Sequence, residues 1–334
     1  MRQVKMKPAF RRTLFLLALV LLVGLTVTGY NLINGQYEPV DVNDKTIKDI
    51  VIPEKSSARQ IAKILLENDL IHSERAFLTY CKRYGYDSSL KAGHYQFSRS
   101  QSLKEIVEAI AQGRIVTITF TIPEGYTVDQ IGNLLISKGI CTEDDWEEAI
   151  NKKYDYPFLR YSDDVRNPLE GFLFPDTYRI SENTNAQTII KLMLNNFESI
   201  WQANYAKQAE EANRDVYEVI TIAAMIEKEA MVGKERPTIA GVIENRLRIG
   251  MPLQIDATVL YALGKHKEKV YNIDSLVDSP YNTYKYNGLP PGPIASPGQA
   301  AINAALNPEK HDYYYYVAKG DGSHYFSKTH DEHI

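Results

Sequence analysis

The sequence of 334 residues has few cysteines and no surplus of positive charge. Its two cysteines, Cys81 and Cys141, are too few for a disulfide scaffold, and the sequence leaves open whether they pair. The net charge is −4. Without the five basic residues among the first twelve positions, 33 basic and 42 acidic residues remain, a net charge of −9. Nucleic acid is therefore excluded as a partner, because no basic footprint is left to meet phosphates.

Motifs of several common enzyme classes are also missing. The sequence has no G-x-S-x-G nucleophile elbow, no Walker lysine motif and no H-E-x-x-H motif. His324, His330 and His333 could bind a metal, but they lie at the end of the chain with no cysteine nearby. A solvated tail or groove contacts are favoured for them, so neither a metal ion nor a cofactor is expected.

A long apolar run occurs only near the N-terminus. Residues 14–30 carry no charge, follow five basic residues, and are long enough for a short membrane-spanning helix. A signal peptide has a similar pattern, but no small-x-small cleavage site follows this run. The sequence predicts a basic cytoplasmic segment at 1–13, a single transmembrane anchor at 14–30 and a polar tether at 31–47. The rest of the chain is then expected on the outer side of the membrane.

An internal repeat follows at an offset of 70 residues. Residues 52–65 align without gaps with residues 122–135, and each copy predicts a strand ending at proline, a polar cap and an amphipathic helix. The first copy continues into a strand at 92–97 and a helix at 103–111, and the second continues into 170–178. Both copies are interpreted as small β/α units.

Two roles remain open for this repeat. Repetition of this size is typical of scaffold or ligand-binding modules, so a duplicated spacer and a glycan-binding module fit equally well. Tyr95, Phe97 and Tyr126 either stack on sugar rings or belong to the core.

The C-terminal half predicts helices followed by a long irregular segment. Helical patterns cover about 185–212 and 237–249. Residues 251–299 are rich in Pro, Gly, Asn, Thr and Tyr and have little periodicity, which is typical of a long functional loop that lines a groove. A short helix is expected at 300–306, and a β-hairpin with an Asp-Gly turn at 313–326.

The most informative residue is Glu229, which lies on an apolar helix face. At about 100° per residue, Ile222, Met225 and Ile226 fall on the same side as Glu229. A carboxylate on this stripe must be neutralised, paired or used in chemistry. Because desolvation raises a carboxyl pKa, Glu229 is a candidate general acid. Glu227 projects with smaller residues and is the weaker candidate.

A structural role for Glu229 is the alternative. Arg236, Arg246 and Arg248 follow closely, and each can supply an ion-pair partner. Ion-pair networks perturb pKa values as active sites do.

Polar and aromatic groups downstream are expected to share a cleft with Glu229. Gln254, Asp256 and Thr258 alternate on one side of a segment interpreted as extended. Tyr281 to Tyr284 and the Pro/Gly segment 288–298 add aromatic faces, amides and a rigid wall. This mixture suits an uncharged or mildly polar sugar polymer and does not suit a phosphate.

Together these motifs resemble the membrane-anchored endolytic murein transglycosylases, the bacterial YceG-like group. The resemblance covers the anchor and nearly all of the remaining chain. It depends on these segments: Ile226-Glu-Lys-Glu229, Glu235-Arg236, Asn245-Arg-Leu247, Leu253 to Val259, Tyr281-Asn-Thr-Tyr284, Gly288 to Ile294, and Gly322 to His333.

The resemblance implies a fold, a location and partners. The expected fold is α+β, with a LysM-like subdomain at 48–115 and a mixed α+β catalytic transglycosylase domain at 116–334 that includes the second repeat. The expected location is the bacterial plasma membrane, single-pass, with a cytoplasmic N-terminus. Expected partners are peptidoglycan glycan strands and either cell-wall synthases (penicillin-binding proteins) or division and elongation proteins.

The resemblance also implies endolytic cleavage of peptidoglycan with Glu229 as the catalytic acid/base. Protonated Glu229 would donate to the oxygen between N-acetylmuramic acid (MurNAc) and N-acetylglucosamine (GlcNAc). It would then take the proton of the muramoyl C6 hydroxyl, which gives a 1,6-anhydro end and terminates elongation of the nascent strand. Residues expected to bind substrate are Gln254, Asp256, Thr258, Tyr281, Asn282 and Tyr284. Residues expected to support the site are Glu227, Arg236, Asn245 and Arg246.

Two alternatives to this mechanism remain open. Asp256 could act as a second carboxylate, which would permit plain hydrolysis. The chain could also be a non-catalytic, membrane-anchored glycan-binding scaffold of the cell-wall synthesis machinery, in which Glu229 is structural.

Overall fold

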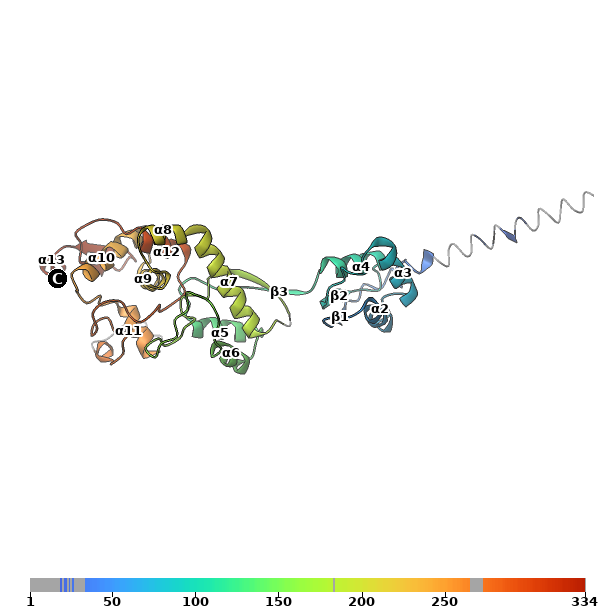
Figure 1. The fold of residues 1–334 in the computed structure, drawn as a ribbon, viewed down its shortest axis with the longest axis horizontal. Coiled ribbons are helices and arrows are strands. Elements are labelled where there is room, and N and C mark those ends of the chain that lie inside the picture. Colours follow the sequence, from blue (N-terminus) through green and yellow to red (C-terminus); the bar gives the residue numbers. More distant parts are fainter. Residues whose placement is uncertain are drawn as a thin grey trace, which may run out of the picture. The chain divides into compact units, whose positions relative to one another are not determined.

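The computed structural model describes residues 19, 21, 22, 24, 26, 34–182, 184–264 and 273–333. The chain divides into two compact units (Figure 1). Unit 1 comprises Met1–Ile118 with Ser181–Asn183, and unit 2 comprises Thr119–Ile180 with Thr184–Ile334.

The expected transmembrane anchor is contradicted. Across the residues that the structure describes, no helix is both long enough and apolar enough to cross a membrane. Most of residues 14–30, where the spanning helix is predicted, lie outside the described residues. The fold is mixed α+β, and the predicted membrane-spanning helix and single-pass location are not supported.

Unit 1 is a small α+β body with a two-stranded antiparallel sheet. Its elements are β1 (Lys48–Ile52), α2 (Ala58–Glu67), α3 (Glu74–Tyr84), β2 (Gly93–Phe97) and α4 (Leu103–Gln112). In the sheet, Ile50 lies opposite Tyr95, and Figure 1 shows the three helices gathered around the two strands. Tyr95 and Phe97 are fully buried, and their rings stack at 5.6 Å. Of the two roles left open for these rings, sugar stacking or the core, the structure supports the core.

Helix starts in both repeats are encoded locally. Ser57 caps α2 in a capping box with Gln60, and Thr127 and Gln130 do the same for α5 (Val128–Ser137) at the same offset of 70 residues. The predicted helix at 103–111 is confirmed as α4, which ends at Gly113 with φ +70°. Only a residue tolerant of the left-handed region ends a helix in this way.

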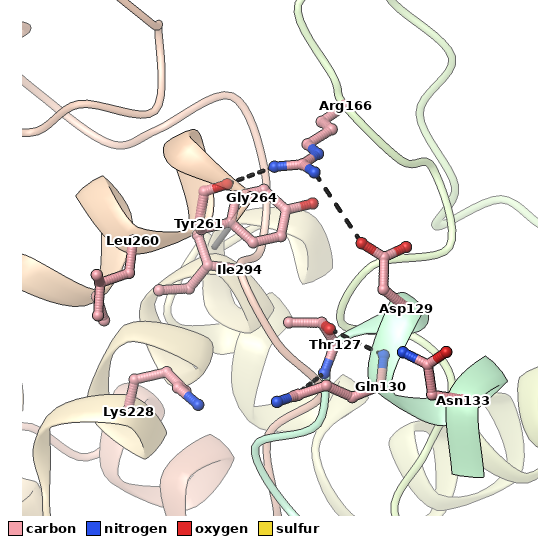
Figure 2. Close-up of a pocket in the computed structure, with 11 residues that line it drawn as sticks. Thr127, Asp129, Gln130, Asn133, Arg166, Lys228, Leu260, Tyr261, Gly264 and Ile294 are labelled. Atoms are coloured by element: carbon pink, nitrogen blue, oxygen red, sulfur yellow. Dashed lines mark hydrogen bonds and ion pairs between the residues drawn. The ribbon is translucent and has the colours of Figure 1, made fainter. Parts of the chain in front are cut away.

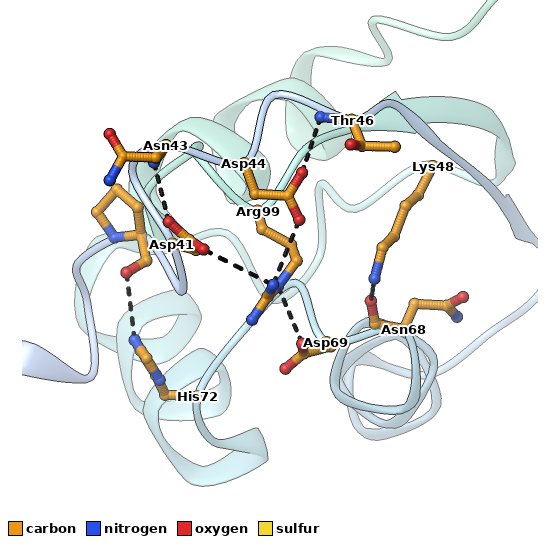
Figure 3. Close-up of polar contacts among 10 residues, drawn as sticks. Asp41, Asn43, Asp44, Thr46, Lys48, Asn68, Asp69, His72 and Arg99 are labelled. Atoms are coloured by element: carbon orange, nitrogen blue, oxygen red, sulfur yellow. Dashed lines mark hydrogen bonds and ion pairs between the residues drawn. The ribbon is translucent and has the colours of Figure 1, made fainter.

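Residues 37–47, expected as part of a tether, are held against the rest of unit 1 (Figure 3). The Arg99 guanidinium lies 2.9 Å from Asp69, 3.3 Å from Asp44 and 3.9 Å from Asp41. The Tyr37 carbonyl accepts from the backbone N–H of Leu103 at 3.1 Å. Because the ion pairs are partly exposed, solvent screens them, and the cluster mainly fixes the path of the chain.

The second repeat follows the same order of elements as the first. It consists of β3 (Thr117–Thr121), α5, α6 (Glu143–Ile150) and β4 (Thr177–Ser181), and β3 pairs with β4 in a two-stranded sheet. The interpretation of both copies as small β/α units is confirmed.

The rest of unit 2 is mainly helical and ends in a hairpin. Its helices are α7 (Ala186–Asn204), α8 (Ala206–Glu211), α9 (Val216–Glu229), α10 (Arg236–Arg248), α11 (Asp256–Leu263), α12 (Gln299–Leu306) and α13 (His330–His333). Two short 3₁₀ turns, η1 (Gly233–Glu235) and η2 (Asp274–Leu276), and the antiparallel strands β5 (Tyr315–Ala318) and β6 (His324–Ser327) complete it. The helices predicted at 185–212, 237–249 and 300–306 and the C-terminal hairpin are confirmed.

Helix α9 is the centre of unit 2. All residues from Val219 to Ile226 are buried, and α12, α10, α11 and α8 pack around the helix. A helix that is apolar on all sides belongs inside a core. Both glutamates of its last turn, Glu227 and Glu229, therefore lie where the buried helix meets the surface.

Candidate functional site

Glu229 is the last residue of α9 and is partly buried. The residues that share its helix face, Ile222, Met225 and Ile226, are fully buried. Burial raises the pKa of the Glu229 carboxyl above its ordinary value of 4.5, and the negative charge of Asp256 raises it further. The proton is therefore held to higher pH than on an exposed glutamate.

Neutral donors orient the Glu229 carboxylate. The Tyr316 hydroxyl on β5 donates to Glu229 Oε2 at 3.0 Å. This hydrogen bond lowers the pKa of Glu229, as do the charge of His324 and the backbone amide of Ala257 in the first turn of α11, but burial is the largest influence. Tyr316 donates to Oε2 and not to Oε1 of Glu229.

His324 on β6 packs against the Tyr316 ring. The two rings meet edge to face, with centroids 5.3 Å apart. His324 Nδ1 lies 2.8 Å from Glu235 Oε2, and the backbone N–H of His324 donates to the same carboxylate at 3.1 Å. Hydrogen bonding by His324 lowers the pKa of Glu235, although burial opposes this. Glu235 therefore anchors the hairpin strand that carries His324 to the start of α10.

The three arginines considered as structural partners of Glu229 are engaged elsewhere. Arg236 pairs with Glu227 at 3.0 Å, Arg246 donates to the Tyr314 carbonyl at 2.6 Å, and Arg248 donates to Asn245 Oδ1 at 2.8 Å. Throughout the described part of the chain, Glu229 has no ion pair within 4 Å. An arginine-locked Glu229 is therefore excluded for these residues.

Asp256 and Tyr284 form a second pair near Glu229. The Tyr284 hydroxyl donates to Asp256 Oδ1 at 2.6 Å, and both residues are exposed. Burial and the hydrogen bond to Asp256 raise the pKa of Tyr284, so the phenol remains a donor at neutral pH. Two carboxyl groups and two tyrosine hydroxyls thus gather at the meeting point of α9, α11 and β5.

The segment around Asp256 is not extended as predicted. Asp256 begins α11, and Thr258 in this helix is fully buried, where its hydroxyl donates to the Ile255 carbonyl at 2.7 Å. Helical rotation replaces the expected alternation, so Gln254, Asp256 and Thr258 do not share one face. Gln254 is exposed and has φ +51°, and Arg246 lies 3.5 Å from its side-chain oxygen.

Tyr281 and Asn282 lie inside the wall of the site. Both are buried. The Asn282 amide donates to the carbonyls of Ser275 and Val277 at 2.9 and 2.8 Å, and the Tyr281 hydroxyl accepts from the backbone N–H of Arg166 at 3.3 Å. These contacts hold the loop that presents Tyr284.

Asn245 and Arg246 join segments that are distant in sequence. The Asn245 amide donates to the carbonyls of His311 and Tyr313, both at 2.9 Å. Arg246 donates to the Leu253 carbonyl at 2.7 Å. Adjacent residues of α10 therefore tie the start of the hairpin to the segment that leads into α11.

Glu227 has the environment of a structural carboxylate. Its side chain is 7% exposed, pairs with Arg236 at 3.0 Å and accepts from the backbone N–H of Gly298 at 3.0 Å. Glu124 lies nearby, and its pKa is raised by burial and then by the charge of Glu227. The histidines once considered as metal ligands are separated: His324 contacts Glu235, whereas His330 and His333 pack on Tyr315.

Tyr316 is the member of the site that the sequence does not single out. It lies 87 residues from Glu229 in the chain and within a run of four tyrosines. Strand alternation places Tyr314 and Tyr316 on the same face, but the partner of that face depends on long-range packing. The run alone therefore gives no reason to choose Tyr316.

The structure therefore presents, on an α+β scaffold, one glutamate whose pKa is raised by burial and which has no ion pair among the described residues. The chain belongs to the YceG-like family, whose model matches residues 50–334. The Bacillus subtilis (strain 168) protein named endolytic murein transglycosylase is 40% identical over 309 residues, 89% of this chain and 85% of that protein.

Two further relatives agree with this family membership. A Streptococcus pneumoniae protein of the same name is 34% identical over 96% of this chain, which spans 63% of that relative's length. The crystal structure of a protein described as YceG-like from Listeria monocytogenes has 37% sequence identity and a TM-score of 0.58, covering 86% of this chain and 98% of that chain.

Proposed function

We propose that this chain is an endolytic murein transglycosylase, a lyase that cuts peptidoglycan glycan strands between MurNAc and GlcNAc. Family membership and the names of the relatives support the activity. The observation that carries the assignment to Glu229 is its environment. Its carboxyl is desolvated, has a raised pKa, accepts one hydrogen bond from a neutral phenol and has no ion pair among the described residues.

In the proposed first step, Glu229 Oε1 delivers its proton to the glycosidic oxygen. Tyr316 donates to Oε2, so Oε1 is the oxygen to which we assign the transferred proton. The bond between that oxygen and the anomeric carbon then breaks, GlcNAc leaves as an alcohol, and the substrate's own N-acetyl oxygen bonds to the anomeric carbon. General acid catalysis of this kind contributes roughly 10²- to 10⁴-fold, so binding and positioning supply the remaining rate enhancement.

In the second step, ionised Glu229 takes the proton of the muramoyl C6 hydroxyl. The C6 oxygen attacks the anomeric carbon, displaces the N-acetyl oxygen and closes the 1,6-anhydro ring, and Glu229 is left protonated again. No water is consumed, because the attacking oxygen belongs to the substrate. This cut ends the nascent strand.

The neighbouring groups take supporting roles in the proposal. Asp256 and Tyr284 are exposed, so they contact the strand, and Gln254 contacts it from the segment before α11. Thr258, Tyr281 and Asn282 are buried and hold these elements in place. Glu227, Arg236, Asn245 and Arg246 fix the ends of α9 and α10 to the surrounding loops.

Unit 1 is proposed as a LysM-like module that binds the same strands. Its small β-α-α-β body with a separate core supports this role. We also propose that the enzyme works beside cell-wall synthases, which include penicillin-binding proteins, or beside division and elongation proteins. This part of the proposal depends on the family resemblance.

Mass spectrometry of products from purified peptidoglycan tests the function. The proposal requires soluble fragments with 1,6-anhydro-MurNAc ends. Reducing MurNAc ends would indicate hydrolysis, with Asp256 as second carboxylate. Retention of the chain on peptidoglycan without any fragment release would indicate the glycan-binding scaffold, the other function that the repeats allow.

A further inference from the structure

A pocket of about 300 Å³ lies in unit 2, beside the first turn of α11 (Figure 2). Its floor includes Leu260 and Tyr261 of α11 and Ile294 of the Pro/Gly segment. Polar residues of the first turns of α5 line another side, as Figure 2 shows for Asp129, Gln130 and Asn133. A pocket of this size is at the lower end of the range for small-molecule sites.

The pocket connects to the proposed catalytic carboxylate through two neighbours. Lys228, which lines the pocket, directly precedes Glu229 in α9. Ala257 also lines the pocket, and its backbone amide lowers the pKa of Glu229. Glu229 itself is not among the lining residues. A strand positioned with its glycosidic bond at Glu229 would therefore bring its next substituents to this pocket.

Two cations face the pocket from different elements. Lys228 is exposed, and its ammonium donates to the Gly125 carbonyl at 3.3 Å; in the described chain it has no carboxylate partner within 4 Å. Arg166 donates to the Tyr261 carbonyl and lies with its guanidinium carbon 5.1 Å from the centre of the Tyr261 ring. Both positive charges are fixed by backbone carbonyls, which leaves donor capacity for a ligand.

Among the described residues that line the pocket, one exposed acid opposes these two cations. Asp129 lies 4.0 Å from Arg166, at the outer limit of an ion pair, and its side chain is 72% exposed. Glu170 lies beneath Tyr261 and is buried, which raises its pKa to about 8, so at neutral pH it is mainly uncharged. The charged groups of the lining, Arg166, Lys228 and Asp129, therefore leave a net positive charge.

We propose that this pocket binds the carboxylate-bearing branch of muramic acid, and thereby selects which muramoyl residue is placed at Glu229. The inference depends on the proposed function, because it takes a peptidoglycan strand as the substrate. Muramic acid differs from GlcNAc in its lactyl group, which ends either in a carboxylate or in an attached peptide with carboxylates of its own. Two cations together with the aliphatic and aromatic lining residues fit such a branch better than they fit a neutral pyranose.

Direct binding to three soluble ligands tests the inference. We would use the full chain carrying Glu229→Gln, so that no ligand is cleaved, and measure calorimetric affinities at low salt. The ligands are a GlcNAc–MurNAc disaccharide with a stem peptide, the same disaccharide with a free lactyl carboxylate, and neutral N,N′-diacetylchitobiose. Adding Lys228→Gln should weaken binding of at least one acidic ligand about tenfold, the loss of one charge-assisted hydrogen bond of about 1.4 kcal/mol.

Two further variants sharpen the result. Asp129→Asn removes the opposing acid and should tighten the same acidic ligand. Lys207→Gln, on α8 with an 89% exposed side chain, removes an equal charge outside the pocket and should change nothing. Weakening of the free-lactyl ligand alone by Lys228→Gln identifies the lactyl carboxylate, and weakening of the peptide-bearing ligand alone identifies a carboxylate of the peptide. Weakening of both shows that either carboxylate can occupy the pocket.

The inference is overturned if Lys228→Gln leaves both acidic ligands unaffected, or weakens chitobiose as much as either of them. Its failure is separable from failure of the proposed function. Fragment release by the unmodified chain tests the function, whereas these affinities are measured without any cleavage.

Discussion

Glu227 and Glu229 both lie in the last turn of α9, but they point to different sides of the helix and have different partners. Glu227 is 7% exposed, is paired with Arg236 and accepts from the Gly298 backbone. Glu229 meets a neutral phenol and the first turn of α11. A carboxylate paired with a cation fixes structure, whereas a desolvated carboxyl without a cation can carry a proton to a substrate. The partner, more than the burial, separates the two roles.

The largest effect is expected when Glu229 is changed to Gln. The amide keeps the shape of the side chain but cannot give up a proton, so the rate of glycan cleavage should fall by roughly 10²- to 10⁴-fold or more. Fragment release from purified peptidoglycan measures this loss, and thermal unfolding checks that the fold persists. Near-normal cleavage by this variant would end the assignment of Glu229.

A smaller effect is expected for Tyr316→Phe, which removes only the hydroxyl that contacts Glu229. The rate should fall about tenfold because Glu229 loses its orientation, the usual order for one hydrogen bond of about 1.4 kcal/mol. The pH profile provides a second readout. This hydrogen bond lowers the pKa of Glu229, so its loss raises that pKa further, and the alkaline limb of activity should move to higher pH.

Tyr314→Phe is the matched control for Tyr316→Phe, since it removes a hydroxyl from the same strand region without touching Glu229. An unchanged alkaline limb in Tyr316→Phe would show that the phenol does not govern the proton of Glu229.

The smallest effect on activity is expected for Glu227→Gln. Breaking the ion pair leaves Arg236 without its partner, which should lower the free energy of unfolding by about 1–3 kcal/mol. Cleavage by the folded variant should change only a few-fold. Denaturant unfolding and fragment release measure the two quantities separately, and a loss of activity as large as that of Glu229→Gln would reverse the comparison.

Glu170, a third buried carboxyl, is expected to affect stability instead of activity. Burial raises the pKa of Glu170 from 4.5 to about 8, so the folded chain holds this proton more tightly than the unfolded chain does. The contribution of the protonated Glu170 to the free energy of unfolding is therefore complete below about pH 4.5, and it is lost as the pH rises towards 8. Glu170→Gln should therefore flatten the fall in unfolding free energy between pH 5 and pH 8, and an unchanged pH dependence would contradict this account.

Local signals in the sequence predict much of the fold. The helices that start at Ser57, Ser102 and Thr127 have their own capping boxes, so their positions are encoded within a few residues. Helix α11 is missed because Asp256 to Leu263 is short, lies between irregular segments and has buried residues on more than one side. Its apolar pattern does not show a single face.

The site is predictable only in part, because only some of its contacts arise from residues that are neighbours in the sequence. Glu229 is found because the apolar residues around it are its neighbours in the helix. The choice between Glu229 and Glu227 is less secure from the sequence, since Ala223 and Ala224 are as buried as Met225. The contact of Tyr316 with Glu229 and the pairing of Arg236 with Glu227 arise from tertiary packing, which no local pattern encodes.

The most direct test is an NMR titration of Glu229 in the chain labelled with ¹³C-glutamate, with the resonance assigned by its absence in Glu229→Gln. The account predicts a pKa above the ordinary value of 4.5, because burial and the charge of Asp256 both favour the protonated carboxyl. A pKa at or below 4.5, as expected for a glutamate held by a cation, would contradict the central claim that Glu229 carries the catalytic proton.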